Sequence, residues 1–169
     1  MLNDSPATRV DSVLAKLGAA LEKGDIDAAV NLFQMDCYWR DLVAFTWNID
    51  TAEGHDAIRD MLTAQLPTIQ PSGFVQDSEW EASENDGVTD GWFAFETKVG
   101  RGVGHVRIRN GLIWTLLTTL TELKGHEEPK GLKRPMGAEH GHDRNRKSWA
   151  ERRTNCLLYT SDAADDSLR

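Results

Sequence analysis

One carboxylate stands in a row of large apolar side chains near residue 40. If this segment is a strand, alternate residues share a face, and that face carries Asp41 with Trp39, Phe45 and Trp47. An apolar pocket raises the pKa of a carboxylate, which suits it to acid–base catalysis. We therefore predict Asp41 as a catalytic base. The alternatives are a pairing of Asp41 with a base such as Arg107, or a position at the solvated end of the strand.

His105 is the second catalytic candidate, because its imidazole titrates near neutral pH. It shares a period-two row with Val103, Arg107 and Arg109. An exposed position on a sheet is the alternative interpretation of this row. The predicted pocket residues are Trp39, Arg40, Phe45, Trp47 and Arg107.

The composition indicates a globular protein without a metal site. Two cysteines, Cys37 and Cys156, give neither a disulfide framework nor a metal-ligand spacing, which favours a reducing, cytoplasmic compartment. His140 and His142 lie two residues apart without nearby cysteines, so a solvated linker is favoured over a metal site there. The basic stretch around them lacks interleaved aromatic residues, which argues against nucleic-acid binding. No apolar run is long enough to cross a membrane.

Charge divides the chain into three segments. Residues 1–123 carry 9 basic and 19 acidic side chains, whereas residues 124–153 carry 9 basic and 5 acidic ones. The last segment, 154–169, has one Arg and three Asp. We predict a folded domain over 1–123, a basic linker over 124–153 that has too few apolar residues for a core, and a separate tail.

Helical signals are gathered in the first half of the domain. Ser5 and Pro6 are typical of a helix start, Gly24 of its end, and Asp25 can cap a second helix. A third helix follows Gly54, and the prolines after it interrupt the chain.

Strand signals fill the rest of the domain, over roughly 37–47, 74–84, 89–99, 102–109 and 112–123. The turns "ENDG" (84–87), "VGRG" (99–102) and "RNG" (109–111) connect the later strands. Helices followed by a mostly antiparallel sheet predict an α+β fold, with the sheet curved around the helices.

The element order, the passage "FQMDCYWRD" and the helix start "EGHDAIRDML" resemble the NTF2-like, SnoaL-like family of cone-shaped α+β domains. That family includes enzymes as well as non-catalytic modules, so the fold alone does not assign a function. Many such domains dimerise through the outer sheet face, and the resemblance therefore implies a homodimer. The set Asp41, Arg40 and Arg107 is similar to the carboxylate–arginine sets of cone-fold epoxide hydrolases, although a second carboxylate cannot be assigned.

A second resemblance runs through "DCYWRDLVAFTWNIDTAEG" (36–54) and residues 120–153. Both stretches look like the N-terminal region of bacterial flavin-containing monooxygenase-like, NAD(P)/FAD-dependent oxidoreductases. The resemblance implies FAD and NAD(P)H bound by a C-terminal flavin domain that would follow the linker. No G-x-G-x-x-G dinucleotide-binding turn occurs in this sequence. We therefore expect no cofactor site in this chain.

The segment "CLLYTSDAAD" (156–165) is similar to a translated transposon-end sequencing adapter, so residues after about 154 are interpreted as an adapter-derived tail. The alternative is a natural terminus. Together these patterns predict a fragment of a flavin-dependent monooxygenase, itself a dimerisation or accessory domain without redox activity. A standalone SnoaL-like hydrolase or isomerase acting on a small apolar substrate, with Asp41 as base, is the alternative.

Overall fold

The computed structural model describes residues 5–134 and 146–154. Contacts between residues divide the chain after Glu128 into two parts. The tail predicted from residue 154 onward lies almost entirely outside the described residues, as do His140 and His142.

Three helices form one layer of the first part. Helix α1 (Pro6–Lys23) begins where the Ser5 hydroxyl accepts a hydrogen bond from the Thr8 amide, and it ends at Gly24, whose φ of 71° is left-handed. Helix α2 (Ile26–Val30) is capped by Asp25, and helix α3 (Gly54–Ile69) begins at Gly54, whose φ is left-handed. The predicted helix starts and the end of α1 are therefore confirmed.

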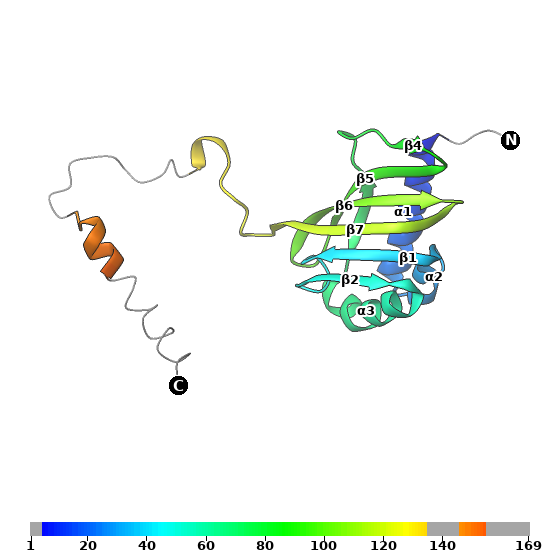
Figure 1. Cartoon of the computed structure of the whole chain (residues 1–169), viewed down its shortest axis with the longest axis horizontal. Coiled ribbons are helices and arrows are strands. Elements are labelled where there is room, and N and C mark those ends of the chain that lie inside the picture. Colours follow the sequence, from blue (N-terminus) through cyan, green and yellow to red (C-terminus); the bar gives the residue numbers. More distant parts are fainter. Residues whose placement is uncertain (1–4, 135–145, 155–169) are drawn as a thin grey trace. The chain divides into compact units, whose positions relative to one another are not determined.

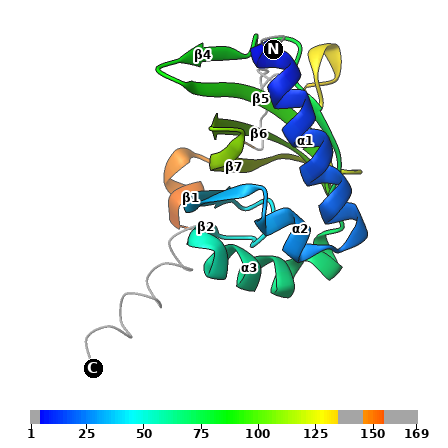
Figure 2. The same cartoon turned by 90° about the vertical axis from the view of Figure 1, so that its right-hand side faces the viewer.

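Seven strands form a single curved sheet, with helices on one face (Figures 1 and 2). The strands are β1 (Phe33–Leu42), β2 (Ile49–Glu53), β3 (Ser72–Gln76), β4 (Ser83–Asn85), β5 (Val88–Glu96), β6 (Gly100–Arg109) and β7 (Leu112–Leu123). Their order is β2-β1-β7-β6-β5-β3, and β4 also pairs with β5. All strand pairs are antiparallel except β1 with β7, which is parallel.

Two tight turns connect β4 to β5 and β6 to β7. Asp86 and Gly87 have φ of 50° and 75°, and Asn110 and Gly111 have φ of 53° and 78°. Two successive positive φ angles match the right-handed twist of an antiparallel hairpin, and Asn, Asp and Gly tolerate them best. The predicted turns at 84–87 and 109–111 are confirmed.

Several sequence expectations about element boundaries were wrong. The predicted turn at 99–102 lies instead at 97–99, because residues 100–102 already belong to β6. The predicted strand 37–47 stops at Leu42, and the separate strand β2 was not anticipated. The predicted strand 74–84 is instead β3 and β4, joined by the segment 77–82. Pro67 lies inside the last turn of α3 rather than after it, and because proline has no N–H, the helical hydrogen bond to the Thr63 carbonyl is not made there.

Aromatic rings fill the space between helices and sheet. Trp39 stacks on Phe33 at 5.8 Å between ring centroids and meets Phe45 edge-on at 5.0 Å. Phe45 continues to Phe95 at 6.0 Å, and Phe95 stacks on Phe74 at 5.5 Å. This continuous file of rings is the centre of the core, because aromatic side chains bury large apolar areas.

The glycines of "GRGVG" make room for these rings. A Cβ on Gly102 would lie 2.5 Å from a ring atom of Phe95, and a Cβ on Gly104 would lie 2.2 Å from a ring atom of Phe93. Both glycines belong to β6 and face the core. The motif therefore serves strand packing, in which the Phe rings of β5 lie over the bare backbone of β6.

The second part contains a short 3₁₀ turn, Gly131–Lys133, and a helical segment over 149–154. At the start of that segment, Glu151 accepts a hydrogen bond from the Ser148 amide and the Ser148 hydroxyl accepts one from the Glu151 amide. This reciprocal pair is a capping box.

Candidate functional site

Asp41 is fully buried near the end of β1, and its carboxylate accepts four hydrogen bonds. One oxygen accepts from the Thr118 hydroxyl at 2.7 Å. The other accepts from the Phe45 amide at 3.0 Å, and from the amide and hydroxyl of Thr46 at 2.8 Å each. The charge is thus compensated by fixed donors rather than by an arginine.

These bonds hold the sharp bend that follows β1. Val43 and Trp47 have φ of 57°, a left-handed conformation that is costly for bulky residues and especially for β-branched valine. The Asp41 carboxylate binds the loop between them, and Val43 donates its amide to the Asn48 carbonyl at 2.9 Å. Asp41 in this geometry fixes the conformation of the 43–48 loop.

The predicted pocket residues lie on different faces. Trp39 and Phe45 are buried in the core beside Asp41, whereas Trp47 is 51% exposed on the loop. Arg40 and Arg107 are exposed on the sheet face that the helices do not cover, because neighbouring strand residues alternate between faces. The structure therefore brings Asp41 together with Trp39 and Phe45 but not with either arginine.

We name the uncovered side of the sheet the outer face. One row of it is almost entirely apolar and runs across six strands. The strand registers align the residues Ile49, Leu42, Thr119, Val103, Ala94 and Val75 in this row. None of the six is buried, and Ile49 and Val75 are 69% and 62% exposed. The next row contains Thr51, Arg40, Leu117, His105 and Trp92.

His105 lies in a small polar and aromatic cluster on this outer face. Its Nε2 atom is 3.3 Å from one Asp90 oxygen, and its ring centroid is 4.7 Å from that of Trp92. The other Asp90 oxygen accepts a hydrogen bond of 2.8 Å from the Ser83 hydroxyl. Since Asp90 stands between Ser83 and His105, the imidazole is not placed to activate that hydroxyl, and the set lacks the order of a nucleophilic triad.

Electrostatics keep the Asp90 carboxylate ionised. Burial by itself raises the pKa of this group, but hydrogen bonds from Ser83 and His105 and the charges of His105 and Arg107 outweigh burial and leave the pKa lowered. The sequence did not indicate this cluster, because its members come from separate strands. In the core, burial raises the pKa of the Cys37 thiol, which disfavours the reactive thiolate.

Two surface clefts lie on the helical side of the domain. One, of about 580 Å³, separates the ends of α1 and α3 and is lined by Leu21, Ile26, Leu66 and Pro67 among others. The other, of about 620 Å³, lies between β2 and α3. Neither is lined by Asp41 or His105. Among the residues described, no three His, Cys, Asp or Glu are grouped to hold a metal ion. In the same residues, no helix has the length and apolar character to cross a membrane.

A layer of helices packed against a curved, mostly antiparallel sheet, with the core between them, defines the NTF2-like class of α+β domains. The predicted fold is thereby confirmed. The family description "SnoaL-like domain" matches residues 14–116, and the chain belongs to that family. Comparison with curated proteins gave no match in sequence.

Solved structures share this fold at low sequence identity. An NTF2-like protein with a cystatin-like fold from Novosphingobium aromaticivorans is 13% identical, with a TM-score of 0.53 over 66% of this chain and 79% of that chain. A protein provisionally named an isomerase, from Bacillus subtilis, is 15% identical, with a TM-score of 0.53 over 70% and 90%. A protein provisionally named a polyketide cyclase, from Xanthomonas campestris, is 14% identical, with a TM-score of 0.50 over 69% and 93%.

Proposed function

We propose that this SnoaL-like domain is a homodimerisation module that serves as an accessory domain of a flavin-dependent oxidoreductase. The observation that carries dimerisation is the apolar row on the outer face. An apolar row is complementary to a second copy of itself, so a two-fold interface can form without matched charges. Water is then released from side chains such as Ile49, Val75 and Val103.

The size of the outer face supports this proposal. The strands lie about 4.8 Å apart, and steps of about 6.7 Å fit roughly four times along β1, β5, β6 and β7 and roughly twice along the shorter β2 and β3, which gives an area of roughly 600 Å². Stable interfaces bury about 800 Å² on each partner. The projected area of the outer face is therefore close to the area that a stable dimer needs, because the side chains add accessible surface to it.

The hydrogen bonds and the packing around Asp41 agree with a non-catalytic role. A general base must have a lone pair directed at the substrate. The Asp41 carboxylate already accepts hydrogen bonds from Thr118, Phe45 and Thr46, and the space beside it is filled by the rings of Trp39 and Phe45. Proton transfer at Asp41 would require both the loop and the aromatic file to rearrange.

The attachment to a flavoprotein is supported by the resemblance of residues 36–54 and 120–153 to that class. In this proposal FAD and NAD(P)H bind the attached domain. The glycine cluster "GRGVG" does not fit a dinucleotide, because its glycines face the core and lie under Phe93, Phe95 and Leu120. We expect the purified chain to be colourless. Sequencing the source DNA beyond the Arg153 codon tests the attachment: a frame that continues into a G-x-G-x-x-G turn supports it, and a stop codon there contradicts it.

Sedimentation equilibrium tests dimerisation. We expect a mass twice that of the 18.9 kDa chain, and a monomer for Val103→Glu, which places a charge in the apolar row. The matched control is Val99→Glu, which changes another exposed valine in the turn before β6. A wild-type monomer, or dissociation of both variants alike, would contradict the proposal. Circular dichroism of each variant shows whether the fold is intact.

The alternative function is a standalone hydrolase or isomerase acting on a small apolar substrate, with Asp41 as base. This chain shares its fold with the proteins provisionally named an isomerase and a polyketide cyclase, and this similarity supports the enzyme alternative. A panel of epoxides and ketones distinguishes the two functions. Turnover by the wild type that is lost in a folded Asp41→Asn variant supports the enzyme, whereas a folded wild type without turnover supports the accessory domain.

A further inference from the structure

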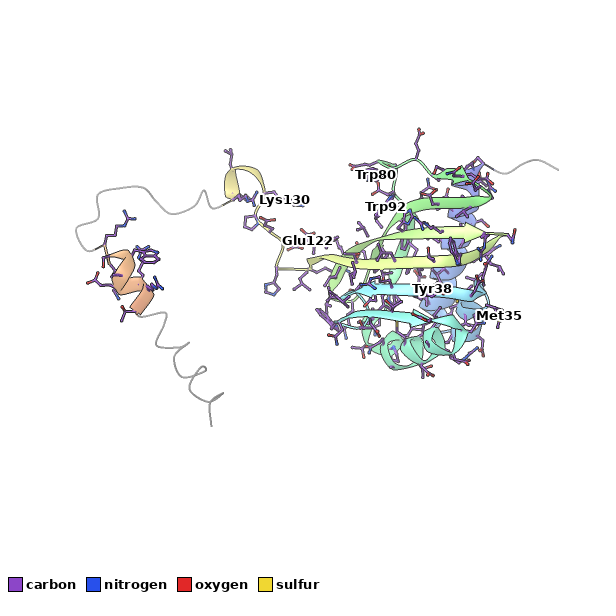
Figure 3. The ribbon with its side chains drawn as sticks, viewed as in Figure 1. Met35, Tyr38, Trp80, Trp92, Glu122 and Lys130 are labelled. Atoms are coloured by element: carbon purple, nitrogen blue, oxygen red, sulfur yellow. The ribbon has the colours of Figure 1, made fainter. Side chains whose placement is uncertain are left out.

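A pair of exposed tryptophans lies at one end of the row next to the apolar row, where Trp92 of β5 meets Trp80 of the segment between β3 and β4. Trp80 is 59% exposed and Trp92 is 36% exposed. Their ring centroids are 6.3 Å apart, and the ring planes are inclined by 45°. Figure 3 shows the two side chains beside each other at this end of the row. Because the two ring planes are inclined, the rings diverge on one side, and we call this open side the wedge.

Both rings are held in place by the surrounding structure. The Asp77 amide donates to the Trp92 carbonyl at 2.9 Å, and the Asp77 side chain accepts from the Glu79 amide at 2.9 Å. This turn anchors the segment that carries Trp80. On the other side, the His105 ring supports Trp92. The backbone around both rings is thus hydrogen-bonded without a ligand, which lowers the entropic cost of binding.

The sequence around the pair is strongly acidic. Residues 70–97 contain seven carboxylates and neither Lys nor Arg. Some of these carboxylates are paired, such as Glu84 with Arg9 and Asp90 with His105. Glu79 and Glu81, which flank Trp80 in sequence, are exposed and form no ion pair with any residue that the structure describes. The residues on both sides of Trp80 in the sequence therefore carry negative charge.

We propose that Trp80 and Trp92 form a binding site for an organic cation, a guanidinium or alkylammonium group, with Glu79 and Glu81 supplying the opposing charge. A cation within about 6 Å of an indole centroid is attracted by the ring quadrupole, and tryptophan is the best partner for this interaction. The cation would occupy the wedge and contact both rings. The same chemistry is presented by a free small cation and by the Arg side chain of a peptide, and the experiment separates these two sources.

The experiment follows the indole N–H signals of ¹⁵N-labelled protein by NMR. Tetramethylammonium chloride and ethylguanidinium chloride are the free cations, and sodium chloride at equal ionic strength is the salt control. A capped Arg-Gly-Arg-Gly-Arg peptide is compared with its citrulline counterpart. The Trp47 indole is an internal control, since it is 51% exposed and has no ring partner among the described residues.

We expect the Trp80 and Trp92 signals to shift saturably while the Trp47 signal does not. Trp80→Ala should weaken binding at least about fivefold, and the double variant Glu79→Gln with Glu81→Gln should weaken it about threefold. Trp47→Ala should change nothing. If the arginine peptide binds more than tenfold tighter than ethylguanidinium, the ligand of this site is a polypeptide. Comparable affinities indicate a small-molecule ligand. Equal shifts at Trp47 and Trp80, or unchanged binding by Trp80→Ala, would overturn the proposal.

Discussion

The Thr118 hydroxyl joins Asp41 to Trp39 across the only parallel strand pair among the described strands. It donates a 2.7 Å hydrogen bond to the Asp41 carboxylate and accepts a 2.9 Å hydrogen bond from the Trp39 indole nitrogen. Both β1 residues and the β7 threonine are fully buried. One hydroxyl therefore satisfies two buried polar groups and links the aromatic core to the loop after β1.

Replacing Thr118 by the isosteric valine removes this link. We expect the free energy of unfolding to fall by about 3 kcal/mol, because a buried indole N–H and a carboxylate oxygen each lose a partner at about 1–3 kcal/mol. Thr118→Ser keeps the hydroxyl and should cost under about 1 kcal/mol. Urea unfolding measures both values. Equal stability of the two variants would show that the network contributes little.

Local chemistry accounts for the parts of the fold that the sequence predicted. The Ser5 cap, the Gly24 terminus and the turns at Asp86–Gly87 and Asn110–Gly111 each depend on residues that are neighbours in the chain. Such signals can be read without knowledge of the tertiary structure.

The bend after β1 was missed because its cause is only partly local. Apolar residues with strand propensity continue through Val43 and Phe45, yet Asp41 draws the chain into a loop while it is itself held by Thr118, 77 residues away. The candidate site was only partly predictable for a related reason. Period two places Arg40 and Asp41 on opposite faces of β1, yet the predicted site combined them, because the pattern could not show which face the helices cover.

Gly104 is expected to tolerate no side chain. An added Cβ would lie 2.2 Å from the Phe93 ring and 2.5 Å from the Leu117 carbonyl oxygen, and the second contact cannot be relieved by a rotamer change. We expect Gly104→Ala to lower the unfolding free energy by at least about 3 kcal/mol. Gly18→Ala is the control, because its Cβ would meet only the Phe74 side chain, at 3.2 Å and beyond, and alanine favours a helix. Thermal unfolding measures both variants, and soluble yield replaces it if Gly104→Ala does not fold. Equal values for Gly104→Ala and Gly18→Ala would contradict the prediction.

Asp90 should contribute to stability in a pH-dependent manner. Burial raises its pKa, but the hydrogen bonds from Ser83 and His105 and the charges of His105 and Arg107 dominate, so the folded-state pKa is lowered. The contribution is present above the unfolded-state pKa of about 3.9 and is lost as the pH falls through the folded-state pKa. We expect under about 1 kcal/mol, because roughly a third of the side chain is exposed and screened by solvent.

The measurement is the unfolding free energy of wild type and Asp90→Asn from pH 6 to pH 3. The difference between them should be largest at pH 6 and shrink toward pH 3. Asp11→Asn is the control, since Asp11 is an exposed carboxylate on α1 with no ion pair to any residue in the described part of the chain. A constant difference for Asp90→Asn across this range would mean that the ionisation of Asp90 is not coupled to folding.

Gln76 offers a substitution that should stabilise the domain. Its side-chain carbonyl oxygen is buried and has no hydrogen-bond partner among the described residues. An unsatisfied buried acceptor costs about 1–3 kcal/mol, and methionine has a similar shape without that demand. We expect Gln76→Met to raise the unfolding free energy by about 1 kcal/mol. Gln65→Met, on the part-exposed side of α3, serves as the control and should give no such gain. If Gln76→Met instead destabilises the protein, the Gln76 amide makes a favourable interaction, and the prediction is wrong.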